Sequence, residues 1–389
     1  MKKRAFYYVF ILAVILLAIG LRLYAAERLD VDFDEPVYMR NAIAYAGFIR
    51  SGQLKMLAWY ERTYEHPALN KIVYSLALLT QPPLDKLAAG DLPPRAPLET
   101  TEARRWLMAE RYAALLAGSI AVAILAFANP LAGFFMGVST LGVKYTSEAY
   151  LEALPLLTSL LCALAYLRWF ENLRKSAAQR NRLWLFLSAL FLGMTAASKY
   201  VYCIVGIVIV AHFLIAMLQK QIQPRMLAWL FGWGLTAMLM FFLFDPYLWP
   251  HPLDRLIHTI QFHLSFTESR IVKEFNYPFW QPFVWLSDFS RFYDLKPRSA
   301  FPINLDVFIF GLAIIGLPRL FLKGRFFFYW LLIGLSFLLI WTTKWPQYTM
   351  VIIVPFTVSA SEGMFTIWSL ASRYILRKRS DPTSQQTQP

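Results

Sequence analysis

"AFYYVFILAVILLAIGLRLYAA", residues 5–26, follows the basic residues Lys2, Lys3 and Arg4. A helix of about 20 apolar residues is long enough to cross the hydrocarbon core of a bilayer. The stretch therefore predicts a membrane-spanning helix. A cleavable signal peptide is the alternative, because Ala25-Ala26 ends the stretch. An uncleaved anchor is favoured, since the apolar core is longer than the roughly 7–15 residues of a signal peptide.

The composition of the whole chain is typical of an integral membrane protein. Of its 389 residues, 58% are hydrophobic and only 16% are charged, whereas soluble domains average about 25% charged residues. The formal net charge of +14 is spread over the connections between apolar stretches rather than along one stripe. A nucleic acid is therefore not an expected partner. The two cysteines, Cys162 and Cys203, lie in apolar runs, which argues against a disulfide framework or a cysteine metal site.

Apolar stretches predict an all-α polytopic protein with about ten transmembrane helices. Lys and Arg should gather in cytoplasmic connections, and "RWFENLRKSAAQRNR", "QKQIQPR", "PRLFLKGR" and "SRYILRKRS" fit alternate connections when the N-terminus is cytoplasmic. Both termini are then cytoplasmic, and the polar loops 27–105 and 249–304 face outward. We expect a multi-pass protein of the inner or plasma membrane. The predicted spans are roughly 5–26, 106–127, 129–145, 150–169, 183–198, 200–218, 226–248, 305–321, 326–344 and 348–370.

The first outer loop should contain two short helices. "PVYMRNAIAYAGFIRSG", residues 36–52, has proline at a favourable first position and Gly52 at a favourable end. It is amphipathic and should lie in the membrane interface. "PALNKIVYSLALLT", residues 67–80, is too short to span, which favours an interfacial or re-entrant helix. A proline-rich linker follows. One membrane domain over residues 1–375 and a disordered cytoplasmic tail over 376–389 complete the expected organisation.

Two clusters of charged residues stand out in this loop. "VDFDEPVYMR", residues 31–40, places Asp32, Asp34 and Glu35 directly after the first span. Because a carboxylate near the hydrocarbon boundary costs free energy, acids kept there need a partner or a function. One alternative is that they cap the helix that begins at Pro36. Capping and catalysis are compatible, since a capped acid is held rigidly.

The second cluster, "YERTYEHPALNKIVY", residues 60–74, contains Glu65, His66 and Lys71. Here the alternative is another helix start, with the charges solvated. Lys199 and Lys344 map to the outward ends of later spans, where an ordinary interfacial lysine is the competing interpretation.

Together the two clusters resemble the GT-C glycosyltransferases. The most similar group is the protein O-mannosyltransferases with their aminoarabinose-transferring relatives, which have an outward "DE" pair followed by an "HPPLxK"-like motif. These motifs stand here as Asp34-Glu35 and "HPALNK", His66 to Lys71, preceded by Glu65. "RYAALLAGSIAVAILAF", "KYTSEAYLEALPLL", "GMTAASKYVYCIVGI" and "TKWPQYTMVIIVP" resemble later family segments, so the similarity covers most of residues 1–370. Ala68 replaces the second proline, and Gln347 replaces the usual arginine.

The resemblance implies transfer of a sugar, with inversion, from a polyprenyl-phosphate donor to a hydroxyl acceptor outside the cytoplasm. Asp34 is the implied general base, because partial desolvation can raise a carboxyl pKa toward that task. Glu35 is the second candidate base or a structural partner. The leaving phosphate needs cations or hydrogen-bond donors. The implied donor-binding residues are Glu65, His66, Lys71, Lys199, Lys344 and Tyr348.

Cofactor and acceptor are left open. Glu65 and His66 could bind a divalent cation, with His251, His258, His263 or Glu148 as additional ligands, but two adjacent ligands are too few for a metal site. The acceptor could be protein, lipid or glycan. The family suggests mannosyl or other hexosyl transfer, protein glycosylation and the cell envelope, although loop 249–304 is too short for a folded lumenal domain.

Two other functions compete with a transferase. Transporters and lipid flippases commonly show internal repeats and functional charges near the membrane midplane. This sequence has no evident repeat, and its acids gather in outer loops. A non-catalytic membrane scaffold would need no base at Asp34. The enzyme is the favoured interpretation.

Overall fold

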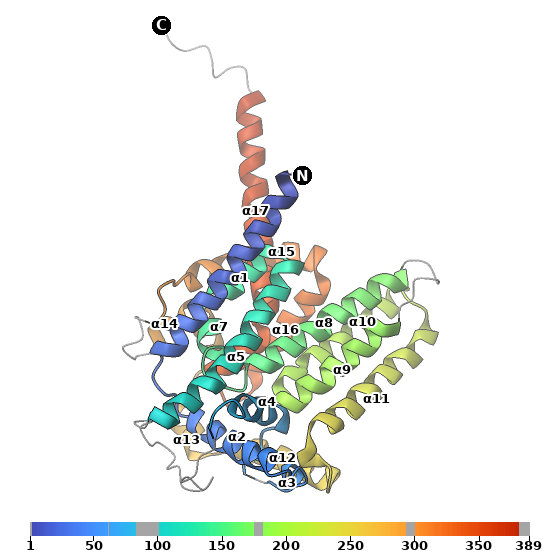
Figure 1. Cartoon of the computed structure of the whole chain (residues 1–389). Coiled ribbons are helices and arrows are strands. Elements are labelled where there is room, and N and C mark those ends of the chain that lie inside the picture. Colours follow the sequence, from blue (N-terminus) through green and yellow to red (C-terminus); the bar gives the residue numbers. More distant parts are fainter. Residues whose placement is uncertain (1, 61, 83–100, 175–181, 293–299, 381–389) are drawn as a thin grey trace.

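The computed structural model describes residues 2–60, 62–82, 101–174, 182–292 and 300–380, and all regular structure within them is helical (Figure 1). The predicted all-α class is thereby confirmed. Short 3-10 turns are η2 (Tyr200–Cys203), η3 (Pro224–Met226), η4 (Pro246–Leu248) and η6 (Pro346–Ile352). The helices are α1 (Lys2–Arg28), α2 (Glu35–Arg50), α3 (Met56–Trp59), α4 (Ala68–Leu78), α5 (Thr101–Ala128), α6 (Pro130–Val138), α7 (Thr140–Tyr145), α8 (Ala153–Arg174), α9 (Arg182–Ser198), α10 (Ile204–Leu218), α11 (Leu227–Phe244), α12 (Pro252–Phe266), α13 (Arg270–Phe275), α14 (Gln281–Phe292), α15 (Asp306–Lys323), α16 (Arg325–Ile340) and α17 (Ile353–Ser380).

Within the described residues, six helices are long and apolar enough to cross a membrane, and the expected number of ten is not reached on this criterion. α9 and α16 are apolar but shorter. The stretch 129–145, expected to be one span, is broken into α6 and α7. Asn129 accepts a hydrogen bond from the amide of Ala132 and starts α6, and Ser139 starts α7 in the same way through Gly142. The six candidates are Arg4–Arg28, Ala103–Ala128, Ala153–Leu173, Tyr200–Leu218, Pro224–Phe244 and Pro346–Tyr374.

The first helix is an integral part of the bundle. α1 packs along α5 and α6 and buries Ile11, Val14 and Ala18. Removing it would expose the core of the bundle.

Two glycines allow α15 and α17 to approach closely. A Cβ atom built on Gly316 would overlap the carbonyl oxygen of Ser359, and one on Gly363 would overlap that of Leu312. Small residues at such a crossing let helix backbones touch, which gives membrane helices much of their packing energy.

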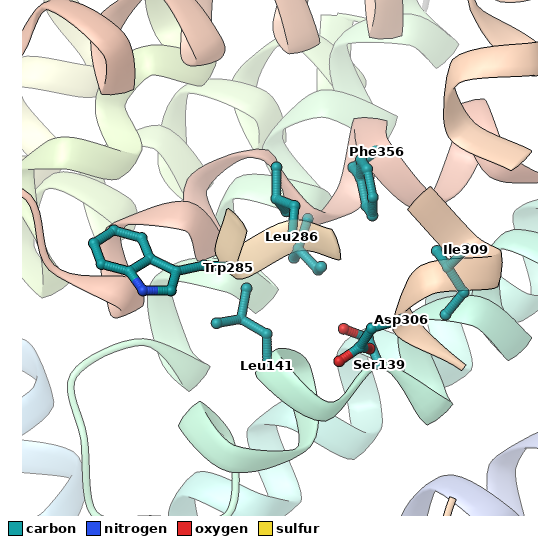
Figure 2. A pocket seen from close by; sticks show the side chains of 8 residues that line it. Ser139, Leu141, Trp285, Leu286, Asp306, Ile309 and Phe356 are labelled. Carbon is teal, nitrogen blue, oxygen red and sulfur yellow. The ribbon is translucent and has the colours of Figure 1, made fainter. Parts of the chain in front are cut away.

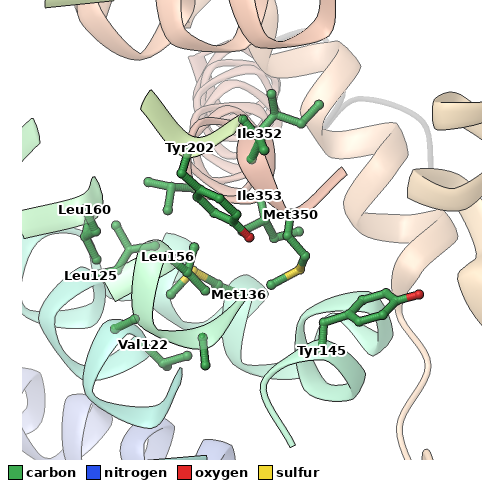
Figure 3. Packing of buried hydrophobic residues seen from close by; sticks show 14 of the residues in the cluster. Val122, Leu125, Met136, Tyr145, Leu156, Leu160, Tyr202, Met350, Ile352 and Ile353 are labelled. Carbon is green, nitrogen blue, oxygen red and sulfur yellow. The ribbon is translucent and has the colours of Figure 1, made fainter. Parts of the chain in front are cut away.

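The apolar core is continuous through the bundle. Figure 3 shows Val122 and Leu125 of α5 near Leu156 of α8, with Tyr202 and Met350 beside them. A second junction joins α7, α14, α15 and α17 (Figure 2), where Asp306 accepts hydrogen bonds from the amide and hydroxyl of Thr140. The gap there has no volume open to a water molecule, so this junction is packed rather than a binding site.

Parts of both predicted outer loops lie at the end of the bundle opposite the two termini, whereas α14 packs beside α15 and α7. α2, α3, α4 and α12 gather at the end opposite the termini (Figure 1). The amphipathic helix predicted at 36–52 is α2, and the short helix predicted at 67–80 is α4, which packs against α2. The linker at 83–100 and the tail at 381–389 lie outside the described residues, while α17 continues past residue 375 to Ser380.

Candidate active site

Asp34 stands at the beginning of α2 with its carboxylate uncommitted to the helix. Its backbone carbonyl accepts hydrogen bonds from the amides of Val37 and Tyr38, at 3.0 and 3.1 Å, but its side chain caps no amide. Burial and the neighbouring Asp32 carboxylate raise the pKa of Asp34, while the positive charges of Lys199 and Lys144 oppose that rise. Capping therefore does not account for this side chain. It remains a half-buried carboxylate of increased basicity.

Glu35, in contrast, is fully buried, and both of its carboxylate oxygens accept hydrogen bonds. Nε and Nη2 of Arg111 bind its two oxygens at 2.8 and 2.6 Å, and the amides of Ala149 and Asp32 donate at 2.7 and 3.0 Å. The same guanidinium donates to the carbonyls of Ala26, Leu29 and Asp30. The pair thus ties the α1–α2 turn to α5. Of the two roles expected for Glu35, the geometry favours the structural one, which fixes the direction of the adjacent Asp34.

Asp32 is the ionised neighbour in this cluster. The Lys144 ammonium donates to Asp32 at 2.6 Å and to Glu148 at 2.5 Å, and the Tyr150 hydroxyl donates to the other Asp32 oxygen at 2.5 Å. Burial acts to raise the pKa of Asp32, but Lys144 and Tyr150 hold that pKa below its usual value. Two carboxylates, Asp32 and Asp34, therefore have pKa values displaced in opposite directions. Such divergence is how protein sites assign a fixed anion and a base.

Lys199 and Tyr348, both expected at a donor site, lie together. Lys199 occupies the break between α9 and η2, its ammonium pairs with the buried Glu152, and it lies 5.4 Å from the centre of the Tyr348 ring. The charge of Lys199 also acts on Asp34. These side chains therefore bring one cation and one phenol hydroxyl near the candidate base.

The loop of residues 63–66 is fastened through each of its carbonyl groups. Lys71 donates to the carbonyls of Thr63 and His66, at 2.7 and 2.8 Å. Thr259 of α12 donates to the carbonyl of Tyr64 at 3.2 Å, and His263 donates to that of Glu65 at 3.0 Å. Lys71 is buried and thus positioned as a structural element of the loop.

The Glu65 and His66 side chains are partly shielded from solvent. The His66 ring packs edge-on against Tyr38, with centroids 5.6 Å apart. Burial raises the pKa of Glu65 and lowers the pKa of His66. The positive charges of Lys199 and Lys71 lower the pKa of His66 further, because they repel an imidazolium cation. Neutral His66 can therefore line the site as a hydrogen-bonding group.

Lys344 lies at the C-terminal end of α16. Its ammonium donates to the carbonyls of Leu338, Leu339 and Trp341 at 3.1, 3.2 and 2.5 Å. A lysine in the last turn satisfies free carbonyls and interacts well with the helix dipole. Since three acceptors occupy it, this position favours the interfacial interpretation over phosphate binding.

No group of three or more His, Cys, Asp or Glu side chains within the described ranges could hold a metal ion. His66 and His263 have ring centroids 6.4 Å apart, and His263 is committed to the carbonyl of Glu65. The divalent cation considered from the sequence has no preformed ligand set in this part of the chain.

Lys144, Tyr150 and Glu152 were not among the expected site residues. All three belong to "KYTSEAYLEALPLL", a segment already singled out for its resemblance to an outer turn of the family. The sequence showed that this predicted outward turn contains charged residues. It did not show that these residues pair with Asp32 and Lys199, which are far away in the chain.

Two solved structures resemble this chain over most of its length. Both are ArnT from Cupriavidus metallidurans, one bound to undecaprenyl phosphate (16% identity, TM-score 0.53) and one in the apo state (14% identity, TM-score 0.54). The chain has the ArnT fold. The alignments cover 92% and 94% of this chain, which spans 60% of the length of each ArnT chain. No protein-family model and no curated protein matches the sequence. The fold implied by the motif resemblance is thereby confirmed.

Proposed function

We propose that this protein is a GT-C glycosyltransferase that moves a sugar from a polyprenyl-phosphate donor to a hydroxyl acceptor. The observation that carries the proposal is the contrast between Asp32 and Asp34. The Asp32 carboxylate forms an ion pair with Lys144 and accepts a hydrogen bond from Tyr150, whereas the half-buried Asp34 has a raised pKa and no capping role. The ArnT fold supports the donor class, because one of the two ArnT structures is bound to undecaprenyl phosphate.

In the proposed reaction, Asp34 takes the proton of the acceptor hydroxyl as that oxygen attacks the anomeric carbon. The bond between this carbon and the donor phosphate oxygen breaks, and its electron pair leaves with the polyprenyl phosphate. Attack from the face opposite the leaving group inverts the sugar. A base with a raised pKa has more driving force for the proton transfer, provided that it is ionised at the working pH.

Lys199 and Tyr348 are the proposed phosphate-binding groups, with His66 beside them. A cation and a hydroxyl donor stabilise charge that develops on a leaving phosphate. Glu65 is proposed to face the donor or acceptor, while Glu35, Lys71 and Lys344 hold the backbone. Because the basic connections of the sequence are expected to be cytoplasmic, we propose that the reaction takes place on the opposite, extracytoplasmic side.

The direct test is to incubate the purified protein in nanodiscs with polyprenyl phosphates carrying mannose, glucose or aminoarabinose, and to measure the polyprenyl phosphate released. The family resemblance makes a mannosyl or other hexosyl donor and a protein acceptor the first pair to test. Turnover with at least one donor is expected. Absence of turnover with every donor, from folded protein and with glycolipid and peptide acceptors supplied, contradicts the proposal.

A matched pair of lysine variants tests the phosphate site. Lys199→Met should increase the KM for the donor, because a cation whose charge acts on Asp34 is lost. Lys344→Met should leave the donor KM unchanged, since that lysine caps α16. An equal increase in both variants would remove the distinction on which the phosphate assignment depends.

A further inference from the structure

A pocket opens at the end of the bundle that holds the two termini, away from the Asp34 cluster. Its volume is about 330 Å³, and its walls come from α5, α8, α15, α16 and α17. The hydroxyl of Tyr7, near the start of α1, donates to the carbonyl of Phe127 at 3.1 Å, so the last turn of α5 lies beside the N-terminal helix turn. The residues that line this pocket have no part in the candidate active site.

The lining changes from apolar to polar along the helices. On four walls an apolar residue lies one turn or less farther from the C-terminal end of its helix than a polar one does. These pairs are Leu125 and Asn129 at the end of α5, Leu167 and Arg168 on α8, Leu320 and Lys323 on α15, and Val358 and Glu362 on α17.

This order matches the order of groups in a phospholipid. Three of the walls belong to candidate spans, namely Ala103–Ala128, Ala153–Leu173 and Pro346–Tyr374. The polar lining therefore lies where the spans leave the hydrocarbon core, and the apolar lining lies on the side of the membrane interior. A phospholipid bound there would place its headgroup at the polar rim and its glycerol ester region on the apolar floor.

The charges around the pocket leave one positive charge in excess. Glu362 forms an ion pair with Arg319, and Arg168 lies 3.7 Å from Glu171. Within the described ranges, the exposed Lys323 ammonium has no hydrogen-bond or ion-pair partner. A ligand that carries a single negative charge would compensate Lys323, whereas a zwitterion would not.

Arg168 can serve as a second donor to that charge. Its distance to Glu171 is longer than a hydrogen bond, and more than half of each side chain is exposed. Such surface pairs contribute little free energy, so the guanidinium can turn toward a phosphate at small cost. Arginine and lysine are the side chains that bind phosphate oxygens most strongly.

The remaining polar wall is already fixed. The Asn129 amide nitrogen donates to the Ser361 hydroxyl at 2.8 Å, and its oxygen accepts from the amide of Ala132 at 3.1 Å. The Arg319–Glu362 pair joins α15 to α17 beside it. A ligand therefore does not have to order this side of the pocket, which favours binding.

The pocket also joins two of the connections that the sequence predicts to be cytoplasmic. Arg168 begins "RWFENLRKSAAQRNR", and Lys323 belongs to "PRLFLKGR". Basic pockets between membrane helices on the cytoplasmic side bind the headgroups of anionic lipids.

We propose that this pocket binds an anionic phospholipid that carries one phosphodiester charge, as phosphatidylglycerol does. The phosphate contacts Lys323 and Arg168, and the glycerol ester region packs on Leu167, Leu320 and Phe327. The site does not depend on the proposed transferase activity, because it shares no residue with the Asp34 cluster and is tested by binding alone.

The test titrates the full-length protein, purified in a neutral detergent, with phosphatidylglycerol and measures bound lipid by native mass spectrometry. We expect one saturable site, and an increase of about tenfold or more in its Kd for Lys323→Gln. Lys220→Gln is the matched control, because Lys220 is an exposed lysine of another predicted cytoplasmic connection and lies outside the pocket. Equal Kd values for the two variants would attribute binding to net charge and overturn the proposal.

Thermal unfolding provides a second readout. A ligand that binds only the folded protein increases its stability. Phosphatidylglycerol should therefore raise the Tm of the unmodified protein and of Lys220→Gln, and raise that of Lys323→Gln much less at the same lipid concentration. An equal rise in all three would contradict the site.

Three further arms identify the ligand and its place. Ala128→Trp fills the pocket from an exposed lining position without changing any charge, and should weaken binding as Lys323→Gln does. An unchanged Kd in folded Ala128→Trp would show that the lipid binds elsewhere. Equal binding of phosphatidylethanolamine would contradict the charge match, and equal binding of soluble glycerol phosphate would contradict a membrane lipid as the ligand.

Discussion

The two ends of the helix bundle differ in how deeply their ion pairs are buried. At the Asp34 end, several almost fully buried charged side chains have an oppositely charged partner on another element or one turn away, among them Glu35, Arg111, Lys144, Glu148 and Glu152. At the other end, Arg168 and Glu171 pair at 3.7 Å with more than half of each side chain exposed.

Burying charge costs several kcal/mol per ion unless a partner compensates for it. The chain bears that cost in the polar cluster beside Asp34, whereas the Arg168–Glu171 pair at the other end stays exposed to solvent. The distribution of buried charge, rather than the number of charged residues, therefore distinguishes the end that contains the candidate active site.

The largest difference between the two ends should appear in stability. Glu35→Gln removes the charge that compensates buried Arg111 and should lower the free energy of unfolding by about 3–5 kcal/mol. Glu171→Gln, at the exposed pair, should change it by about 0–1 kcal/mol. Thermal unfolding of both variants in the same nanodiscs measures the contrast. Similar losses would show that the pairs at the two ends contribute alike.

A smaller effect is expected where α15 and α17 cross. Gly316→Ala places a methyl group on the carbonyl of Ser359 and should cost about 1–3 kcal/mol. Gly311, on the same helix, has nothing within 4 Å of a built Cβ atom. Gly311→Ala should therefore be neutral or slightly stabilising, since alanine favours helices more than glycine does. A loss of stability in Gly311→Ala equal to that in Gly316→Ala would contradict the close contact.

The smallest effect concerns the position of the acid limb of the pH–rate profile. A general base must be ionised, so kcat/KM should fall as pH decreases through the raised pKa of Asp34. The negative charge of Asp32 contributes to that raised pKa. Asp32→Asn should therefore lower the Asp34 pKa and move the acid limb to lower pH. Movement to higher pH would contradict the proposed coupling of the two carboxylates.

Local sequence signals were sufficient for the fold and for the position of Asp34. Apolar length predicted the helices, and Pro36 placed the beginning of α2 correctly. The stretch 129–145 was misjudged because its apolar run concealed two helix starts, at Asn129 and Ser139. An N-cap residue inside a hydrophobic run looks like an ordinary polar substitution in a span.

Roles that depend on distant partners could not be predicted. Glu35 and Asp34 are adjacent in sequence, yet their roles differ. Arg111 binds both carboxylate oxygens of Glu35 and does not bind the Asp34 side chain. The sequence position of Lys344 suggested a phosphate ligand, but in the structure its ammonium donates to three backbone carbonyls at the end of α16. In each case the deciding contact depends on how helices pack, which spacing along the chain does not encode.

The central claim is that Asp34 takes the proton of the acceptor hydroxyl. The most direct measurement compares single-turnover transfer by Asp34→Asn and by Asp30→Asn, in a donor and acceptor pair that the unmodified protein uses. Asp30 is the matched control, because its side chain is exposed and its neighbour Arg111 binds only its backbone carbonyl. We predict that Asp34→Asn loses transfer by about 10²-fold or more, the usual scale for a general base, while Asp30→Asn keeps it. Transfer by folded Asp34→Asn at the unmodified rate would contradict the account.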